Sequence, residues 1–367
     1  MKKRFFLKLL SITSAAMAIV ILFILFGSTE KTYGFDKNSS VYEKMNQRKP
    51  VSYLVIGDSI GRGSGAEHPA MRWFKILERR FFIENGIRLN GEYIVQSGAT
   101  AFEGLYKLTS HQENSPVDLI FIVFGENDRK YMNADEFGRI YEALIREAKA
   151  LHPNAELITI TESSLTFENF AKQIAAISSH YQASNIDMRP VFRASGFTAK
   201  ELTRDLVHPN GKGYQLYSDT IYSKLWNNAG NSKKIALLAP PLYDNSFQGF
   251  HEIITPNRQN EFVPQGLFLA SNHIGAIVEY DFTGTFVGAK VLRGPAGGIF
   301  NVYIDDKFVT SLSTWWPFDK ERALYIASGL ADGPHKIRIE VSEKNSPYTT
   351  KTETLIRISS IITNKTQ

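Results

Sequence analysis

Two short segments carry the residue types of an activated serine. The first, residues 55–60, reads VIGDSI and puts Ser59 directly after an apolar, strand-like run and before a glycine-rich turn. The second, residues 205–209, reads DLVHP and puts Asp205 three residues before His208. A hydroxyl, an imidazole base and a carboxylate that orients the base are the parts of a catalytic serine site. Together the segments indicate a serine hydrolase or an acyltransferase.

The spacing of Asp205 and His208 suits a hydrogen bond between their side chains. Such a bond fixes the imidazole tautomer and leaves the second ring nitrogen free to face a serine. Pro209 restricts His208 to an extended backbone. An isolated Asp and His could instead form a metal pair or a surface salt bridge. No third ligand lies at a usable spacing, so we expect no metal.

Two further positions could donate hydrogen bonds to an oxyanion. Gly98 follows the strand-like run YIVQ, and Asn127 lies in GEND after the apolar run IFIVF. The N–H groups of Ser59 and Gly98 and the Asn127 amide suit an oxyanion hole. Taken alone, each is better explained as a helix cap, a turn glycine or a loop cap. A nucleotide-binding role for residues 61–65 is disfavoured because the spacing is not G-x-G-x-x-G.

Apolar runs alternate with amphipathic helical patterns between residues 51 and 228. The sequence predicts strands at 52–56, 93–96, 119–124, 156–161 and 187–192, and helices at 69–82, 134–151, 167–181 and 213–226. This alternation predicts a parallel α/β sheet with helices on both faces. Ligands of such sheets bind at the carboxyl ends of the strands, which is where Ser59 is expected.

The pattern changes after the polar junction at residues 227–232. The sequence predicts strands at 277–282, 285–292, 300–304, 323–326, 336–341 and 354–361, separated by turn signals. Many short strands with regular turns predict a β-sandwich, which we expect to be of jelly-roll type. Asp305 and Asp306 are predicted to turn a hairpin rather than to bind calcium.

The N-terminal residues 1–27 predict a signal anchor, that is, a transmembrane segment. They begin with MKKR, and residues 9–26 carry no charge, which is near the minimum length that spans a bilayer. The basic start predicts a cytoplasmic N-terminus and an exported remainder. The alternatives are a cleaved signal peptide, for which no clear small-x-small site is present, and a buried core helix, which the charge pattern disfavours.

Composition limits the remaining possibilities. The 367 residues predict four parts: the anchor at 1–27, a linker at 28–50, an α/β domain at 51–230 and the sandwich at 231–367. The absence of cysteine excludes disulfides, thiolate catalysis and Cys-ligated metal. The net charge of +5 is mild, and no nucleic-acid partner is expected.

The order Ser, Gly, Asn, then Asp with His resembles that of the SGNH hydrolases, also called GDSL-type esterases and lipases. The resemblance covers about residues 51–226. Its motifs are Gly57-Asp58-Ser59-Ile60, with Ile in place of the usual Leu, Gly98, Gly125-Glu126-Asn127-Asp128, and Asp205 and His208 followed by Pro209-Asn210 and Gly213-Tyr214. Each motif is weak alone, whereas their joint occurrence in this order is specific.

The resemblance implies an SGNH (flavodoxin-like) three-layer fold and a role for each motif residue. Ser59 is then the nucleophile, His208 the general base and later the acid, and Asp205 the residue that orients His208. The Ser59 backbone, Gly98 and Asn127 form the oxyanion hole. The resemblance also implies that neither a metal nor an organic cofactor is needed.

Three residues are candidates for substrate binding. Arg62 lies close to the nucleophile in sequence, and Trp315 and Trp316 lie in a predicted loop of the sandwich. Exposed indole rings stack on sugar faces, although such rings could equally pack inside the protein.

We therefore expect an extracytoplasmic, membrane-anchored esterase that removes O-acyl groups, and specifically O-acetyl groups, from a glycan of the cell envelope or a secreted polysaccharide. The expected partners are the acylated glycan and, through the N-terminal segment, the membrane. The alternatives are an O-acetyltransferase that works with a membrane partner, a lipase or lysophospholipase, and a non-catalytic glycan-binding protein. The sequence leaves open the sugar, the acyl group and the oligomeric state.

Overall fold

A computed structural model describes residues 39–111, 115–243, 249–349 and 354–364. The predicted signal anchor, residues 1–27, lies outside the described residues. Over the described ranges, no helix combines the length and apolar character needed to cross a membrane. Part of the predicted linker forms helix α2 (Val41–Asn46), whose Val41 and Met45 are buried against the following domain. The α/β domain therefore begins before residue 51.

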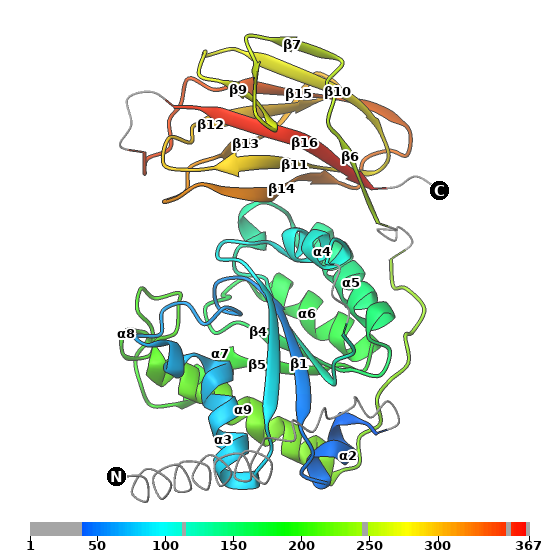
Figure 1. Ribbon diagram of the computed structural model, residues 1–367, viewed down its shortest axis with the longest axis vertical. Helices are drawn as coiled ribbons and strands as arrows, with labels where there is room; N and C mark the ends of the chain where they lie inside the picture. Colours follow the sequence, from blue (N-terminus) through cyan, green and yellow to red (C-terminus); the bar gives the residue numbers. More distant parts are fainter. Residues whose placement is uncertain (1–38, 112–114, 244–248, 350–353, 365–367) are drawn as a thin grey trace, which may run out of the picture. The chain divides into compact units, whose positions relative to one another are not determined.

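A parallel five-stranded sheet forms the first domain (Figure 1). Its strands are β1 (Val51–Gly57), β2 (Leu89–Val95), β3 (Leu119–Val123), β4 (Glu156–Thr161) and β5 (Ser184–Asp187), in the order β2-β1-β3-β4-β5. This is the flavodoxin-like order. β3 and β4 are buried along their whole length, as strands covered on both faces should be.

Helices cover both faces of this sheet. The helices after α2 are α3 (Trp73–Asn85), α4 (Ala101–Thr109), α5 (Ala134–Leu151), α6 (Glu168–His180), α7 (Met188–Ala194), α8 (Ala199–Leu202) and α9 (Gly211–Gly230). One core contains side chains of α4, α5 and α6, and the core on the opposite face contains side chains of α2, α3 and α9. The predicted parallel α/β fold is thus confirmed.

One predicted strand of this domain is wrong, and some of its helices were missed. Residues 187–192 were expected to be a strand, but β5 ends at Asp187 and α7 follows. Asp187 ends the strand because its carboxylate accepts the Arg189 N–H at 3.0 Å and so caps the helix. Helix α4 was not predicted, because its cap comes from far along the chain: the Asp128 carboxylate accepts the Ala101 N–H at 2.7 Å.

The second domain is a β-sandwich of two antiparallel sheets (Figure 1). Its strands are β6 (Phe250–Ile253), β7 (Arg258–Asn260), β8 (Val263–Gln265), β9 (Phe268–Ser271), β10 (Ile277–Thr283), β11 (Phe286–Arg293), β12 (Ile299–Ile304), β13 (Lys307–Ser313), β14 (Lys320–Ser328), β15 (Pro334–Val341) and β16 (Ile356–Asn364). The sheet orders are β13-β12-β15-β10-β7 and β14-β11-β16-β9-β8, with β6 beside β16. Apolar side chains of both sheets form one core.

Six of these strands match the predicted ones, and the jelly-roll connectivity stays a prediction. The hairpin predicted at Asp305 and Asp306 is confirmed: their φ angles are 51° and 62°, as a tight turn between β12 and β13 requires. The missed strands include the short, exposed β7 and β8. These strands have no alternation of buried and exposed residues to read from the sequence.

The sandwich packs on α4 of the first domain, and both belong to one compact unit, Asn38–Gln367. The Phe102 ring lies 4.8 Å from the Phe286 ring and 5.5 Å from the Phe250 ring, measured between centroids. Gly288 of β11 makes this approach possible, because a Cβ there would lie 2.9 Å from the Phe102 ring. Beside them Arg322 binds Glu103 at 2.6 Å, with both side chains 1% exposed.

Phe102→Ala should destabilise the whole chain by about 3–5 kcal/mol, because it empties a buried ring position shared by the two domains. Urea unfolding of the variant and of Phe82→Ala, whose ring is 54% exposed, measures the effect. Equal midpoints for the two variants would contradict the shared core.

Candidate active site

The candidate nucleophile lies in a tight turn at the carboxyl end of β1. Gly57 ends the strand, and a Cβ on Gly57 or Gly61 would lie 3.0 or 2.9 Å from the other's Cα, so both must be glycine. The buried Asp58 carboxylate holds the turn by accepting the Ile60 N–H at 2.8 Å. The turn therefore presents Ser59 at the edge of the sheet where ligands of this fold bind.

Ser59, His208 and Asp205 form a continuous hydrogen-bonded relay. His208 Nε2 lies 2.9 Å from Ser59 Oγ, and His208 Nδ1 lies 2.7 Å from Asp205 Oδ2. The Asp205 carboxylate also accepts the backbone N–H of His208 at 2.8 Å. Burial raises the pKa of Asp205, but these hydrogen bonds outweigh it and hold the pKa below its usual value. An ionised Asp205 favours the proton on Nδ1, which leaves Nε2 as the base facing the serine.

The loop that carries His208 is shaped by two local features. Leu206 has a φ of 70°, and its N–H donates to the Thr203 hydroxyl at 3.0 Å, which turns the chain between Asp205 and His208. Gly65 of the nucleophile turn touches this loop, since a Cβ there would lie 2.8 Å from the His208 Cβ. A larger residue at position 65 would push the histidine away from the serine.

The two predicted oxyanion donors lie on the loops after β2 and β3. Asn127 Nδ2 donates to Asp58 Oδ2 at 2.7 Å, which fixes the amide one residue from Ser59. Gly98 has a φ of 71°, in the left-handed region that favours glycine. Its neighbour Ser97 lies with its hydroxyl 3.4 Å from that of Ser64, so the Gly98 loop contacts the nucleophile turn.

The predicted substrate-binding residues do not share one place. Arg62 is exposed, and its guanidinium lies 3.4 Å from the Ser97 hydroxyl, near the serine as expected. Trp316 packs against the loop that contains Gly98, called the oxyanion loop below, since a Cβ on Gly98 would be 3.4 Å from the Trp316 ring. Trp315 instead packs on Tyr348, with ring centroids 5.1 Å apart. Their roles in binding stay predictions.

Three carboxyl groups buried beneath the site, those of Asp58, Asp128 and Glu162, received no role in the sequence analysis, although the first two lie in its motifs. Asp128 accepts N–H groups from Ala101 and Gly125, and burial raises its pKa to about 7. Burial also raises the pKa of Asp58 to about 6 and that of Glu162 well above its usual value. A side-chain hydrogen bond between these two carboxyl groups acts in opposite directions: it lowers the pKa of Asp58 and raises that of Glu162. One signal in the sequence could have pointed to Glu162. It directly follows the buried strand β4, at the end of the sheet where the candidate site lies.

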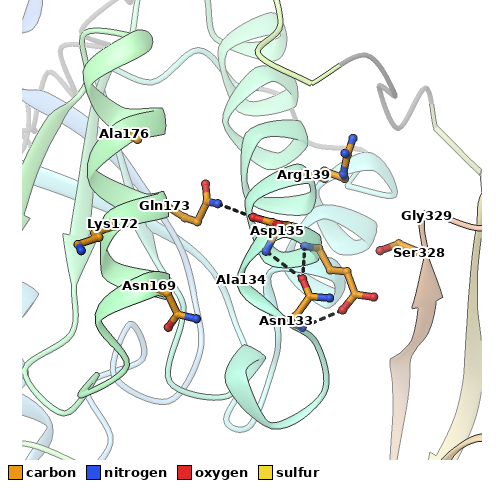
Figure 2. A pocket seen from close by; sticks show the side chains of 11 residues that line it. Asn133, Ala134, Asp135, Arg139, Asn169, Lys172, Gln173, Ala176, Ser328 and Gly329 are labelled. Carbon is orange, nitrogen blue, oxygen red and sulfur yellow. Dashed lines mark hydrogen bonds between the residues drawn. The ribbon is translucent and has the colours of Figure 1, made fainter.

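A separate groove of about 740 Å³ contains none of these residues (Figure 2). It lies between the start of α5, the side of α6 and the Ser328–Gly329 turn of the sandwich. Its polar groups bind one another: Asn133 caps α5, and Gln173 Nε2 donates to Asp135 at 3.1 Å. No group in it is poised for catalysis, and we assign it no role.

Comparison with known families agrees with this geometry. The profile of the GDSL-like Lipase/Acylhydrolase family matches residues 55–216. These residues form a GDSL-like domain. The resemblance read from the motifs is thereby confirmed, and the GDSL-like domain is that of a carboxylic ester hydrolase. No curated protein matches the chain significantly.

Both domains also have solved counterparts. A two-domain esterase, CEX, active on acetylated mannans and co-crystallized with mannopentaose, matches with a TM-score of 0.69 and 15% identity, over 89% of this chain and 94% of that chain. A second CEX structure matches with a TM-score of 0.66 and 17% identity, over 88% and 94%. At these identities the likeness shows a shared two-domain fold.

Glu162→Gln should flatten the dependence of stability on pH. A carboxyl whose folded pKa is raised stays protonated in the folded protein while it ionises in the unfolded chain. Its contribution to the free energy of unfolding therefore falls as pH rises above its unfolded pKa. Glutamine mimics the protonated form without titrating, so urea unfolding from pH 5 to 8 should show a shallower decline than in the wild type. The exposed Glu343→Gln is the matched control; a wild-type slope in both variants would contradict the assignment.

Proposed function

We propose that the protein is a serine esterase that removes O-acyl groups, specifically O-acetyl groups, from a glycan. The observation that carries the proposal is the relay from Ser59 Oγ through His208 to Asp205, with contacts of 2.9 and 2.7 Å. Its place at the end of β1 in a GDSL-like domain supports the same chemistry.

The proposed reaction has two acyl-transfer steps. His208 Nε2 takes the Ser59 proton as the hydroxyl attacks the ester carbonyl, and Asp205 stabilises the imidazolium that forms. His208 then gives that proton to the sugar oxygen as its bond to the carbonyl carbon breaks, so the sugar leaves as a free hydroxyl and the acyl group stays on Ser59. Water, deprotonated by His208, attacks this acyl-enzyme, and the acid and free Ser59 are released.

We assign the oxyanion hole to the N–H groups of Ser59 and Gly98 and to the Asn127 amide. The fixed bond between Asn127 and Asp58 supports this role, because a donor held in place before the reaction needs no reorganisation when charge develops. The second N–H of the same amide can then donate to the oxyanion.

A glycan is proposed as the substrate because the sandwich brings an aromatic ring to the oxyanion loop. Trp316 lies beside Gly98, where a sugar carrying the ester would stack. The CEX esterase, which shares the two-domain fold, is active on acetylated mannans. We also propose that residues 1–27 anchor the protein in a membrane, with the catalytic domain on the extracytoplasmic side, on the basis of the charge and hydropathy of that segment.

Acyl transfer to a second glycan hydroxyl instead of water would use the same residues. The exposure of the His208 and Asp205 side chains, 28% and 52%, favours hydrolysis because water reaches the relay directly. A lipase would instead need an apolar site for a long acyl chain, and a profile of rate against chain length distinguishes it.

Ser59→Ala should lower acetate release by at least roughly 10³-fold, because no other group can form the acyl-enzyme. Full-length protein purified in mild detergent is assayed with p-nitrophenyl acetate and an acetylated polysaccharide. The exposed Ser232→Ala is the control variant. Retained activity in Ser59→Ala would refute the mechanism. Transfer of acetyl to an added glycan in preference to water would favour the transferase.

Asn127→Ala should lower kcat on the order of 10²–10³-fold while KM changes little, because its donor acts on the oxyanion rather than on the bound ester. Steady-state kinetics with p-nitrophenyl acetate measure both constants. A rise in KM at constant kcat would place Asn127 in substrate binding instead.

A further inference from the structure

Two arginines of the sandwich lie at the Gly98 end of the candidate site. Arg293 ends β11, Arg322 lies in β14, and both line a recess together with Gly98. The recess has a volume of about 10 Å³, which is room for about one water molecule, so a larger ligand can bind only at its mouth. A Cβ on Gly98 would lie 4.0 Å from Arg322 Nη2. Each guanidinium carbon is 5.1 Å from the ring centre of Trp316. The recess is therefore next to a proposed oxyanion donor.

Positive charge exceeds negative charge around this recess. Arg322, which is 1% exposed, uses Nε and Nη2 to bind Glu103 at 2.8 and 2.6 Å, and its buried Nη1 has no partner among the described residues. The same Glu103 carboxylate binds Lys107 at 3.0 Å. Arg293 donates through Nε to the Trp315 carbonyl at 3.1 Å, and no carboxylate in the described ranges pairs with it. One carboxylate thus faces three cations.

This excess is costly for the protein alone. Burial and the nearby Arg322 lower the pKa of Arg293 to about 10, so the side chain is still a cation at neutral pH. A desolvated cation without a partner is destabilising. The Trp316 ring offsets part of that cost through its face. The ring does not bind the remaining N–H donors of Arg293, which lie in the plane of the guanidinium group. These donors match the geometry of a carboxylate.

We propose that the partly exposed Arg293 binds a carboxylate of the substrate at the mouth of this recess, with the buried Arg322 adding positive charge behind it, so that the preferred substrate is an O-acetylated glycan built from acidic sugars such as uronic acids. The inference depends on the proposed esterase function, whose substrate class it narrows. A uronic acid carries its carboxylate on the same ring as the esterified hydroxyls, which fits a cation such as Arg293 close to the Gly98 loop. Two exposed cations extend the positive charge: Arg62 near Ser97 and Lys130 beside Asn127.

The test compares two polymers that differ in one group. Mannan and polymannuronate of the same linkage, acetylated to the same degree, differ in carrying a hydroxymethyl or a carboxylate group. The wild-type protein should release acetate from polymannuronate with a kcat/KM roughly ten- to a hundredfold higher, the range for charge-assisted hydrogen bonds. This preference should shrink as salt is added, because the surrounding exposed charges are screened. Equal rates on the two polymers would overturn the inference. Failure on both polymers and on p-nitrophenyl acetate would instead overturn the esterase function.

Variants separate substrate binding from a purely structural role. Arg293→Gln should lower kcat/KM for polymannuronate about tenfold relative to mannan, and Arg293→Lys should retain part of the preference. The control is Arg258→Gln, since Arg258 is an exposed sandwich arginine that lies 3.7 Å from Glu279. Thermal unfolding checks that the variants are folded. If Arg293→Gln slows both polymers equally, the arginines serve only to hold Trp316, and the inference is wrong.

Discussion

The hydrogen bonds of Asp58 are the interaction on which the candidate site depends. One oxygen of this buried carboxylate holds the turn that presents Ser59, and the other fixes the Asn127 amide. The candidate nucleophile and the proposed oxyanion donor are thus positioned by a single group, at the cost of burying a carboxyl whose pKa rises to about 6. The side-chain hydrogen bond with Glu162 opposes part of that rise, because it lowers the pKa of Asp58. The candidate site is therefore supported from beneath by fully buried carboxyl groups.

Sequence patterns predicted the parts of the molecule that local chemistry determines. The strand–helix alternation predicted the parallel sheet, and the spacing of Asp205 and His208 predicted their hydrogen bond, because both are local patterns. The contact of His208 with Ser59, 149 residues away, was expected from the order of the motifs and not from any local pattern. Helix α4 and the roles of Asp128 and Glu162 depend on partners tens of residues away. Contacts between residues so far apart in sequence leave no trace in the spacing of apolar and polar residues. The same holds for Trp316, whose sequence context could not distinguish a packed ring from one lying on the oxyanion loop.

The β-sandwich takes part in the site rather than standing beside it. Helix α4 begins three residues after Gly98 and carries Phe102 and Glu103, which contact β11 and β14. The oxyanion loop is consequently held between the sheet of the first domain and the sandwich. In the proposed function, chemistry and substrate recognition are divided between the domains, with the relay on one and Arg293 and Trp316 on the other.

The buried pair of Glu103 and Arg322 has a consequence for how such a protein can evolve. The interface between the two domains contains this desolvated ion pair and the Phe102 ring, which packs on Gly288. Separating the domains would leave an unpaired charge and an apolar surface on each of them. The polar junction at residues 227–232 looks like a place to recombine modules. The two domains are therefore expected to evolve together. A different sandwich in this place would need its own arginine to pair with Glu103.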